Sequence, residues 1–322
     1  MRGTLKFIAG RVVEFILTAL LVSFFTFAAF SVIPGDSARV MLGPDATEEQ
    51  VNELREDLGL NRPLIEQYTS WLKGAFTGDL GESVSFSRPV GELIASRLPV
   101  TLGISVISLI LVILASFPLA AVCSRHPGGK ADNAVSLTGH ILFAIPPFAL
   151  SVILILFCSN VLGLYSVGRY ASPSENFGRY ITSLLLPSLC IALPKIAMTF
   201  KFLRSSMIEY SGSDFVRTSK SHGLTDLQIL LRHIIPNSAV SSITVISLVL
   251  SDIMGGSIVV EQVFNLPGIG RLLLSAISRR DFPLLSGIVL YLAIMTVALY
   301  FISDITASLI DPRIRDGRGQ TS

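Results

Sequence analysis

Four ionisable residues interrupt apolar segments of this sequence, and they are the first candidates for chemistry. Lys195, Asp252 and Asp304 lie inside apolar runs, and Glu261 lies near the end of one. A charged side chain in such a run is costly and is usually paired or functional. Lys195 and Asp252 either line a polar path for a charged substrate or form an ion pair between two helices. We favour the ion pair, and Glu261 and Asp304 share the same two alternatives.

A second candidate is the polar segment 214–237, which separates two apolar runs. Gly223 divides it into two helix-like pieces. Thr225 can cap the second piece, whose apolar residues recur at helical spacing (Ile229, Leu230 and Ile234). Pro236 closes this piece and opens the next apolar run. Such a helix–glycine–helix elbow, with apolar residues left over, suits contact with another protein; an ordinary solvated loop is the alternative.

The motifs of ATPases and of intramembrane enzymes are missing from the sequence. It contains no G-x-x-x-x-G-K-[ST] loop for phosphate, no H-E-x-x-H, no G-x-S-x-G and no G-x-G-D. The histidines and cysteines form no ligand spacing (His126, His140, His222, His233, Cys123, Cys158 and Cys190). We therefore predict no catalytic residue, no metal site and no cofactor bound by this chain.

The composition is that of an integral membrane protein. Of 322 residues, 51% are hydrophobic and only 15% are charged, whereas soluble domains carry about 25% charged residues. The net charge of +2 is too small to suggest a nucleic acid partner.

Six apolar runs predict an all-α protein with six transmembrane helices. They cover residues 12–33, 100–123, 135–164, 181–203, 239–260 and 284–309. Each is long enough, since about 20 helical residues cross a bilayer core. The first run exceeds the apolar region of a signal peptide and lacks a cleavage site, so we expect a retained span. Pro146 and Pro147 predict a kink or break in the third run.

The remaining segments complete the organisation. Residues 1–33 form the N-terminus and the first span, and residues 34–97 form an outer insert. Residues 98–309 form a five-span membrane domain that contains the elbow at about 204–238, and residues 310–322 form a tail. In the insert, Thr47 and Gln50 predict a capping box for a short helix that ends at Gly59. Pro63 starts a second helix that carries Trp71. Two small helices cannot bury a large core, so they should lie against the membrane domain.

The distribution of basic residues predicts that both termini and the elbow are cytoplasmic. Lys and Arg are more frequent around Arg125 and Lys130, in residues 201–232 and in the tail than in the short outer loops. The arginines of one outer loop weaken this trend without reversing it (Arg271, Arg279 and Arg280).

The elbow resembles the cytoplasmic loop of bacterial ABC importer permeases, whose signature runs E-A-A, three residues, Gly, nine residues, I-x-L-P. Counted from Gly223, the triad falls on Arg217, Thr218 and Ser219, and Pro236 matches the closing proline, while the Glu and the first Ile do not match. The R-T-x triad and the ending R-H-x-x-x-N at 232–237 resemble the dipeptide, oligopeptide and nickel branch. The stretches at 58–71, 78–83, 255–271, 280–283 and 311–315 also resemble that branch.

This resemblance implies the type I ABC importer permease fold, with the first span and the insert as the additional piece of this branch. It implies that the elbow docks on an ATPase subunit. The coupling residues carried over are Asp214, Phe215, Val216, Arg217, Thr218, Ser219, Gly223, Leu224, Arg232, His233 and Pro236.

The resemblance also implies the assembly and its location. The expected partners are two ATP-binding subunits holding ATP and Mg, a second permease in a heterodimer (a homodimer stays open), an extracytoplasmic solute-binding protein, and membrane lipid. The expected location is the bacterial inner membrane, and the expected substrates are peptides or a related solute such as chelated nickel. A stand-alone secondary transporter or channel is the alternative, although it gives no reason for a docking elbow.

Overall fold

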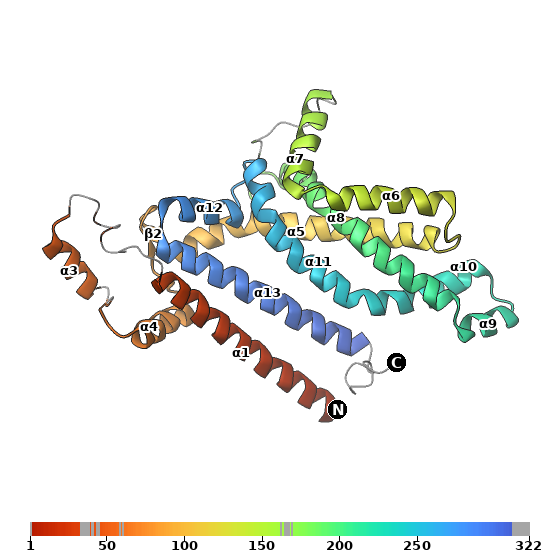
Figure 1. Ribbon diagram of the computed structural model, residues 1–322, viewed down its shortest axis with the longest axis horizontal. Coiled ribbons are helices and arrows are strands. Elements are labelled where there is room, and N and C mark those ends of the chain that lie inside the picture. The colour runs from red at the N-terminus through yellow and green to blue at the C-terminus, as the bar shows by residue number, and fades with distance from the viewer. Residues whose placement is uncertain are drawn as a thin grey trace. The chain divides into compact units, whose positions relative to one another are not determined.

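The computed structural model describes residues 2–32, 39, 42, 46–57, 59, 61–161, 163, 168 and 170–310. The described chain is helical apart from one two-stranded hairpin (Figure 1). Its elements are α1 Arg2–Val32, α3 Glu48–Asp57, α4 Leu64–Thr77, β1 Glu82–Ser83, β2 Arg88–Pro89, α5 Val90–Cys123, α6 Lys130–Ala144, α7 Pro147–Leu156, η1 Phe157–Val161, α8 Phe177–Ser211, α9 Asp214–Ser221, α10 Asp226–Ile229, η2 Leu230–Ile234, α11 Ile235–Val263, α12 Ile269–Arg279 and α13 Phe282–Ile310. The predicted tail beyond Ile310 and much of the start of the predicted insert lie outside the described residues.

Five helices are long and apolar enough to cross a membrane, and a bent pair makes a sixth if it counts as one span. The five lie in α1, α5, α8, α11 and α13, and the pair is α6 with α7, bent by 105°. This confirms five of the six predicted spans and the break at Pro146 and Pro147, while the third predicted span is the bent pair. Helix α5 begins at Val90, before the apolar run at residue 100, because a helix satisfies its own backbone hydrogen bonds and can continue past the bilayer core.

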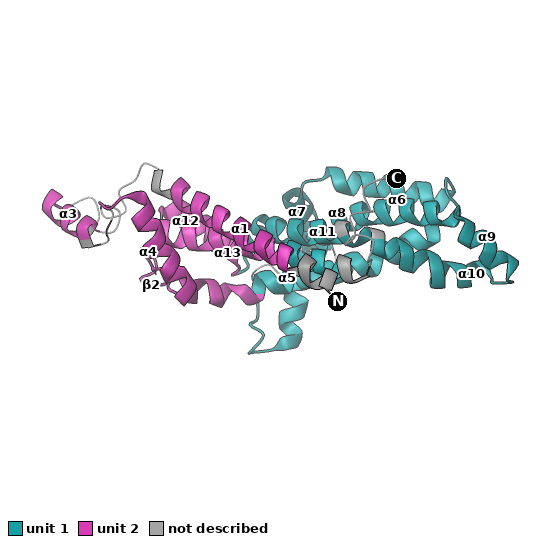
Figure 2. Ribbon diagram, turned by 90° about the horizontal axis from the view of Figure 1, so that it is seen from below, with its two compact units in different colours: residues 1–8, 100–266, 299–322 teal, residues 9–99, 267–298 magenta. Residues whose placement is uncertain are grey.

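The described chain forms two compact units (Figure 2). Unit 1 contains residues 1–8, 100–266 and 299–322, and unit 2 contains residues 9–99 and 267–298. In unit 1, α8 packs against α6, α7 and α11. The main core of unit 1 also includes Ile104 of α5, packed with Leu184 of α8 and Ile253 of α11. All three side chains are fully buried.

A glycine sets the approach of α5 to α8 within unit 1. A Cβ atom placed on Gly103 would lie 2.1 Å from Tyr180 Oη and 2.7 Å from Leu184 Cδ1. One helix turn further along each helix, Ser108 Oγ donates a hydrogen bond to the carbonyl of Ser188 at 3.0 Å. Small residues let helix backbones approach closely in a membrane, where packing rather than the hydrophobic effect holds helices together.

In unit 2, helix α4 of the insert packs on α1. The ring of Tyr68 lies 5.3 Å from that of Phe24, and the ring of Trp71 lies 5.4 Å from that of Phe27. The hydroxyls of Tyr68 and Ser23 are 2.8 Å apart. Both predicted insert helices are present, as α3 and α4. Helix α4 packs on the first span, and the expected packing of the insert helices against the membrane domain stays a prediction.

A buried carboxylate joins the hairpin to the start of α13. Asp281 is fully buried. Its Oδ2 accepts hydrogen bonds from Ser83 Oγ at 2.6 Å and from the Ser85 N–H at 2.9 Å. Its Oδ1 accepts one from the Leu284 N–H at 3.2 Å, as a helix N-cap does. Asp281 of the R-D-F-P stretch therefore fixes the hairpin to the start of α13 within unit 2.

We predict that Gly103→Ala destabilises the protein, because the added methyl group has no room beside Tyr180. Overpacking of this kind costs about 1–3 kcal/mol, which exceeds the gain of roughly 0.5–1 kcal/mol from replacing a helical glycine. Thermal unfolding of the detergent-solubilised protein measures the effect. Gly10→Ala is the matched control, because nothing lies within 4 Å of its added Cβ. Equal unfolding temperatures for the two variants would contradict the packing.

Candidate functional site

The elbow consists of α9, a turn at Gly223, and α10 continuing into η2. Gly223 has φ 81°, a left-handed conformation that glycine adopts without steric cost. Thr225 and Gln228 form a reciprocal cap: the Gln228 N–H donates to Thr225 Oγ1 at 3.4 Å, and the Thr225 N–H donates to Gln228 Oε1 at 3.0 Å. The helix–glycine–helix shape predicted from the sequence is therefore present.

The prediction that Pro236 closes the second piece is wrong. The chain stays helical from Asp226 through the π-helical segment η2 into α11, and Pro236 lies in the first turn of α11. Proline has no N–H to donate to the carbonyl of Arg232, and its ring would clash with that carbonyl in a regular α-helix. A widened π turn at this place accommodates the ring. The elbow is consequently continuous with the span α11.

Apolar residues on one side of the elbow bury it against two spans. We name this group the elbow core. It consists of Ala120, Cys123, Phe200, Leu203, Met207, Val216, Ile229, Leu230 and Ile234, all buried. These residues come from α5, α8, α9, α10 and η2. The elbow therefore contacts α5 and α8 directly through side chains, and it continues into α11 without a break in the helix.

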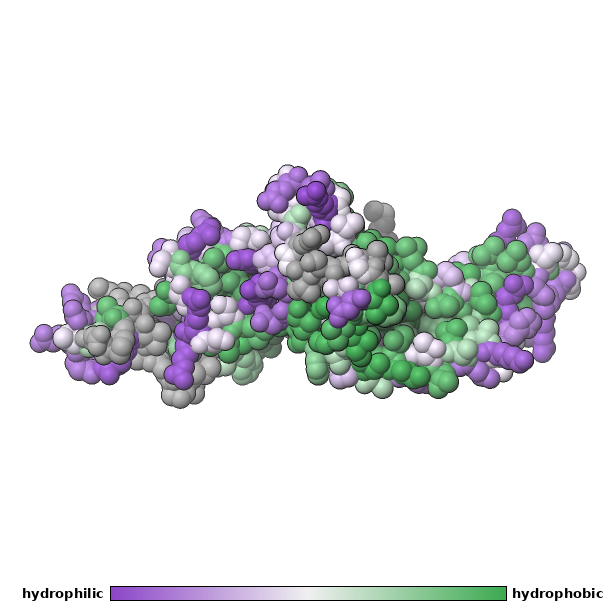
Figure 3. Space-filling model, turned by 90° about the horizontal axis from the view of Figure 1, so that it is seen from above, coloured by the Kyte–Doolittle hydropathy of each residue, from purple (hydrophilic) through white to green (hydrophobic). Residues whose placement is uncertain are grey.

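The other side of the elbow is exposed and mixed in character. The side chain of Arg217 is 83% exposed, and Asp214, Thr218 and Arg232 are exposed too. Leu227 and Leu231, one helix turn apart, are 52% and 57% exposed. In Figure 3, hydrophilic and hydrophobic side chains lie side by side at the end of unit 1 that holds α9 and α10. This surface combines charges with apolar anchors, as interface surfaces do.

The sequence did not single out Leu227 and Leu231. Their spacing of four residues places them on one helix face, but Ile229, Leu230 and Ile234 took the role of the apolar stripe. Those three are the buried residues of the elbow core. The signal that could have identified this exposed apolar surface was a pair of leucines, four residues apart, on the otherwise polar side of the helix.

An ion pair closes the elbow across Gly223. Lys220 Nζ lies 2.9 Å from Asp226 Oδ1, and the hydrogen bond from Lys220 lowers the pKa of Asp226. A lowered carboxyl pKa means that the pair contributes above the ordinary pKa of Asp and is lost only as the pH falls through the lowered value. Both groups are exposed, so the pair orients the turn at neutral pH and adds little stability.

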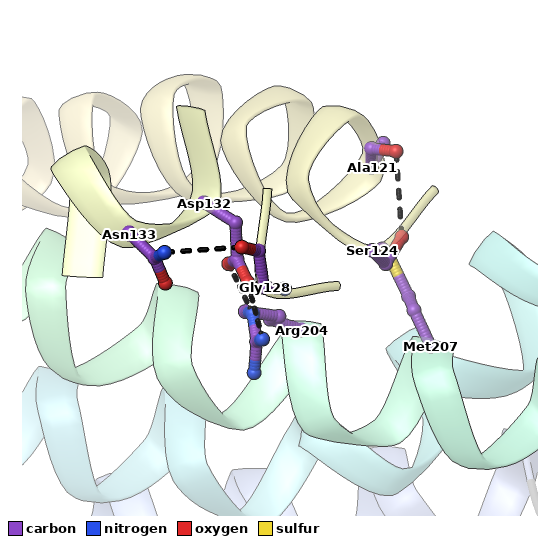
Figure 4. Close-up of polar contacts among 7 residues, drawn as sticks. All are labelled: Ala121, Ser124, Gly128, Asp132, Asn133, Arg204 and Met207. Carbon is purple, nitrogen blue, oxygen red and sulfur yellow. Dashed lines mark hydrogen bonds and ion pairs between the residues drawn. The ribbon is translucent and has the colours of Figure 1, made fainter. Parts of the chain in front are cut away.

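A buried ion pair joins the start of α6 to α8 (Figure 4). Asp132 is 2% exposed, and the guanidinium of Arg204 contacts both of its carboxylate oxygens. The Gly128 N–H donates to Asp132 Oδ2 at 2.8 Å, and Asn133 Nδ2 donates to the Gly128 carbonyl at 3.0 Å. Figure 4 shows Asp132 and Asn133 projecting from α6 on the side that faces Arg204. This pair holds the turn between α5 and α6, and the sequence analysis missed it.

Lys195 and Asp252 form an ion pair between α8 and α11, with Nζ 2.7 Å from Oδ2. Both residues also line a cavity of about 330 Å³. The other lining residues are Phe143, Ala144, Ile145, Pro146, Pro147, Ile191, Pro194 and Gly256. The residues at the break between α6 and α7 thus form part of the wall of this cavity. The two alternatives for Lys195 and Asp252, an ion pair between helices and a polar path for substrate, are compatible, because the paired side chains line a cavity.

Glu261 and Asp304 do not belong to this cavity. Glu261 is fully buried and accepts a hydrogen bond from Thr101 Oγ1 at 2.7 Å, so it joins α11 to α5. Asp304 is half-buried in the last part of α13. Among the described residues, no group of three or more His, Cys, Asp or Glu side chains is placed to hold a metal ion.

We predict that Arg204→Ala strongly destabilises the protein, because it leaves the buried Asp132 carboxylate without its counter-charge. Breaking a buried pair costs about 3–5 kcal/mol, and the partial exposure of Arg204 places the loss toward the lower figure. The measurement is thermal unfolding, with the exposed Lys201→Ala on the same helix as control. The double variant Asp132→Asn/Arg204→Met should recover part of the loss, because no bare charge remains. A variant Arg204→Ala as stable as Lys201→Ala would refute the role of the pair.

Comparison with known proteins agrees with this architecture. Residues 112–316 match the family described as "Binding-protein-dependent transport system inner membrane component", and residues 4–105 match its N-terminal counterpart. The chain is 33% identical over 309 residues to a probable peptide ABC transporter permease of Sinorhizobium fredii, covering 96% of this chain and 99% of that protein. It is 32% identical over 311 residues to the oligopeptide permease AppB of Bacillus subtilis, covering 96% and 98%.

A further relative and one solved structure extend the comparison. The glutathione permease GsiC of Escherichia coli is 31% identical over 315 residues, covering 97% of this chain and 99% of that protein. A chain of the MetNI methionine ABC transporter has a similar fold, with a TM-score of 0.56 at 18% identity, covering 68% of this chain and 96% of that chain. The chain therefore belongs to the family of binding-protein-dependent inner membrane transport components, as a permease subunit of an ABC importer whose ATPase activity lies in partner subunits.

Proposed function

We propose that this chain imports peptides or closely related solutes. The relatives named above carry the words peptide, oligopeptide and glutathione in their names, and glutathione is itself a small peptide. No nickel permease is among them, so chelated nickel falls behind peptides as a substrate. The arrangement that carries the mechanism is the elbow, whose exposed face offers a docking surface and whose buried face rests on the spans.

The proposed assembly pairs this chain with a second permease, two ATP-binding subunits holding ATP and Mg, and a solute-binding protein. Support for the second permease comes from α11. Gly255 and Gly256 have nothing within 4 Å of an added Cβ, so another helix could approach closely there. Both termini and the elbow lie in the cytoplasm in this proposal, in line with the basic residues of the inner loops.

In the proposed cycle, closure of the ATP-binding subunits moves α9 and α10. The elbow core passes this movement to α5 and α8, and the continuous helix passes it to α11. Packed helices move as rigid bodies, so the result is a change of access from one side of the membrane to the other. The cavity lined by Lys195 and Asp252 lies between α8, α11 and the α6–α7 break, and it is the proposed substrate path.

We predict that Gly223→Pro uncouples ATP hydrolysis from uptake while the protein stays in the membrane. Proline fixes φ near −65°, whereas this position has φ 81°, and it removes the N–H that donates to the Lys220 carbonyl at 3.0 Å. The control is Gly223→Asn, because Asn tolerates the left-handed conformation and should preserve coupling. The measurement is uptake per ATP hydrolysed in proteoliposomes. Normal uptake by Gly223→Pro would sink the coupling role.

We also predict that Lys195→Met lowers peptide uptake by about tenfold or more. One charge-assisted hydrogen bond contributes roughly 1.5–3 kcal/mol, and 1.4 kcal/mol corresponds to a factor of about ten. The exchange variant Lys195→Asp/Asp252→Lys separates the two roles of the pair, since it keeps an ion pair but reverses the charges that face the cavity. Continued loss of uptake in the exchange variant supports the path. Full recovery would show that the pair only holds α8 to α11.

A further inference from the structure

Unit 2 contains a basic pocket that neither the elbow nor the substrate path uses. Its volume is about 360 Å³. Three of its lining residues are arginines, namely Arg97 of α5 with Arg271 and Arg279 of α12. The others are Phe86, Pro267, Gly268, Leu272 and Ser275, so none of the described residues that line it is acidic. We name it the arginine pocket.

The pocket is a built feature of unit 2. Arg271, Ser275 and Arg279 recur every four residues and so share one face of α12, while Ile269 and Ala276 are buried in the core of unit 2. The clasp of Asp281 on the hairpin places Phe86. The guanidinium carbon of Arg279 then lies 5.2 Å from the centre of the Phe86 ring, within range of a cation–π contact.

The pocket lacks an acceptor for at least one of its donors. Arg97 Nε is buried and has no hydrogen-bond partner among the described residues. A buried donor left unpaired costs about 1–3 kcal/mol. Arginine stays charged at any physiological pH and presents a planar fork that suits a carboxylate. The positive charge that these guanidinium groups bring to an open pocket therefore favours an anionic group that enters from outside unit 2.

The arginine pocket lies near the end of α5 that extends past the apolar run. Helix α5 has 34 residues, which make about 51 Å at 1.5 Å per residue, whereas the hydrocarbon core is about 30 Å thick. Arg97 precedes the apolar run that starts at residue 100, so we infer that the pocket lies outside the core. In the proposed orientation this is the outer face, where basic residues oppose the usual positive-inside bias. The positive-inside rule does not explain a cluster of arginines on that face, so the cluster indicates another role.

We propose that the arginine pocket receives an acidic side chain of the solute-binding protein. This rests on the proposed function, which supplies that partner and the outward orientation, and the family description itself names a binding protein. A carboxylate on a short stem can pair with the guanidinium groups that line the pocket. A phospholipid is less suited, because its acyl chains need a continuous apolar surface and the apolar walls are only Phe86, Pro267 and Leu272.

The test is the affinity of the assembled transporter, in phosphatidylcholine nanodiscs, for the solute-binding protein that stimulates its ATP hydrolysis. Arg97→Gln/Arg279→Gln should weaken binding by about tenfold or more, since one charge-assisted contact corresponds to roughly that factor. It should also reduce the salt dependence of binding. The control is Arg88→Gln, an exposed hairpin arginine that pairs with Glu92 at 3.2 Å outside the pocket and should bind normally.

Three results would overturn the proposal. The first is equal affinity for the double variant and the control, with unchanged thermal unfolding of both. The second is a defect that appears only in nanodiscs containing phosphatidylglycerol, which would assign the pocket to a lipid phosphate. The third is failure of the unchanged transporter to bind any solute-binding protein, which would refute the proposed partner as well. The result that supports the proposal is a loss of affinity by the double variant in phosphatidylcholine nanodiscs, with an unchanged unfolding temperature.

Discussion

The elbow core is the interaction on which the rest of the mechanism depends. Val216, Ile229 and Ile234 of the elbow are buried against Phe200, Leu203 and Met207 of α8 and Cys123 of α5. Because close-packed side chains cannot deform gradually, they transmit displacement as a change of packing. Without these contacts the exposed arginine and leucines could bind a partner but could not move a span. In the proposed mechanism, docking and transmission thus occupy opposite faces of the same short helices.

Two departures from regular helix, the break between α6 and α7 and the π turn η2, occur where neighbours or a cavity can tolerate them. In a bilayer, irregular backbone is stable only when it is buried in protein or lines a polar space. The 105° break between α6 and α7 lines the cavity beside Lys195. The π turn η2 lies in the elbow, and its residues Leu230 and Ile234 are buried in the elbow core. Pro236 is accommodated beside that turn, so one irregularity joins the elbow to α11 instead of separating them. The second helix of the elbow and α11 therefore form one continuous helical segment.

The sequence predicted the features that depend on neighbouring residues. Hydropathy located the spans, Pro146 and Pro147 located the break, and Gly223 with Thr225 defined the elbow. It failed where distant residues decide the outcome. The partners Asp132 and Arg204 are separated by 72 residues, and Phe86 meets Arg279 only through the Asp281 clasp. Local preference also misled at Pro236, because proline ends an isolated helix but not one whose next turn widens within a packed cluster. The path and coupling residues stay predictions that rest on the arrangement described here.

The charged groups differ in how completely the protein satisfies them, and this difference separates structural from functional roles. Asp132 is 2% exposed, and both of its carboxylate oxygens accept hydrogen bonds from within the protein, from Arg204 and Gly128, so it is covered and paired with its counter-charge. Asp252 is 59% exposed while its partner Lys195 is largely covered, so in the proposed path one carboxylate oxygen is available to a solute in the cavity. Arg97 carries a buried Nε–H without an acceptor among the described residues, an arrangement that a folded protein keeps at a cost in stability. Ser116 Oγ and Thr199 Oγ1 are also buried without a partner there, so incomplete satisfaction alone does not identify a site. What distinguishes Arg97 is that it lines a pocket together with two further arginines.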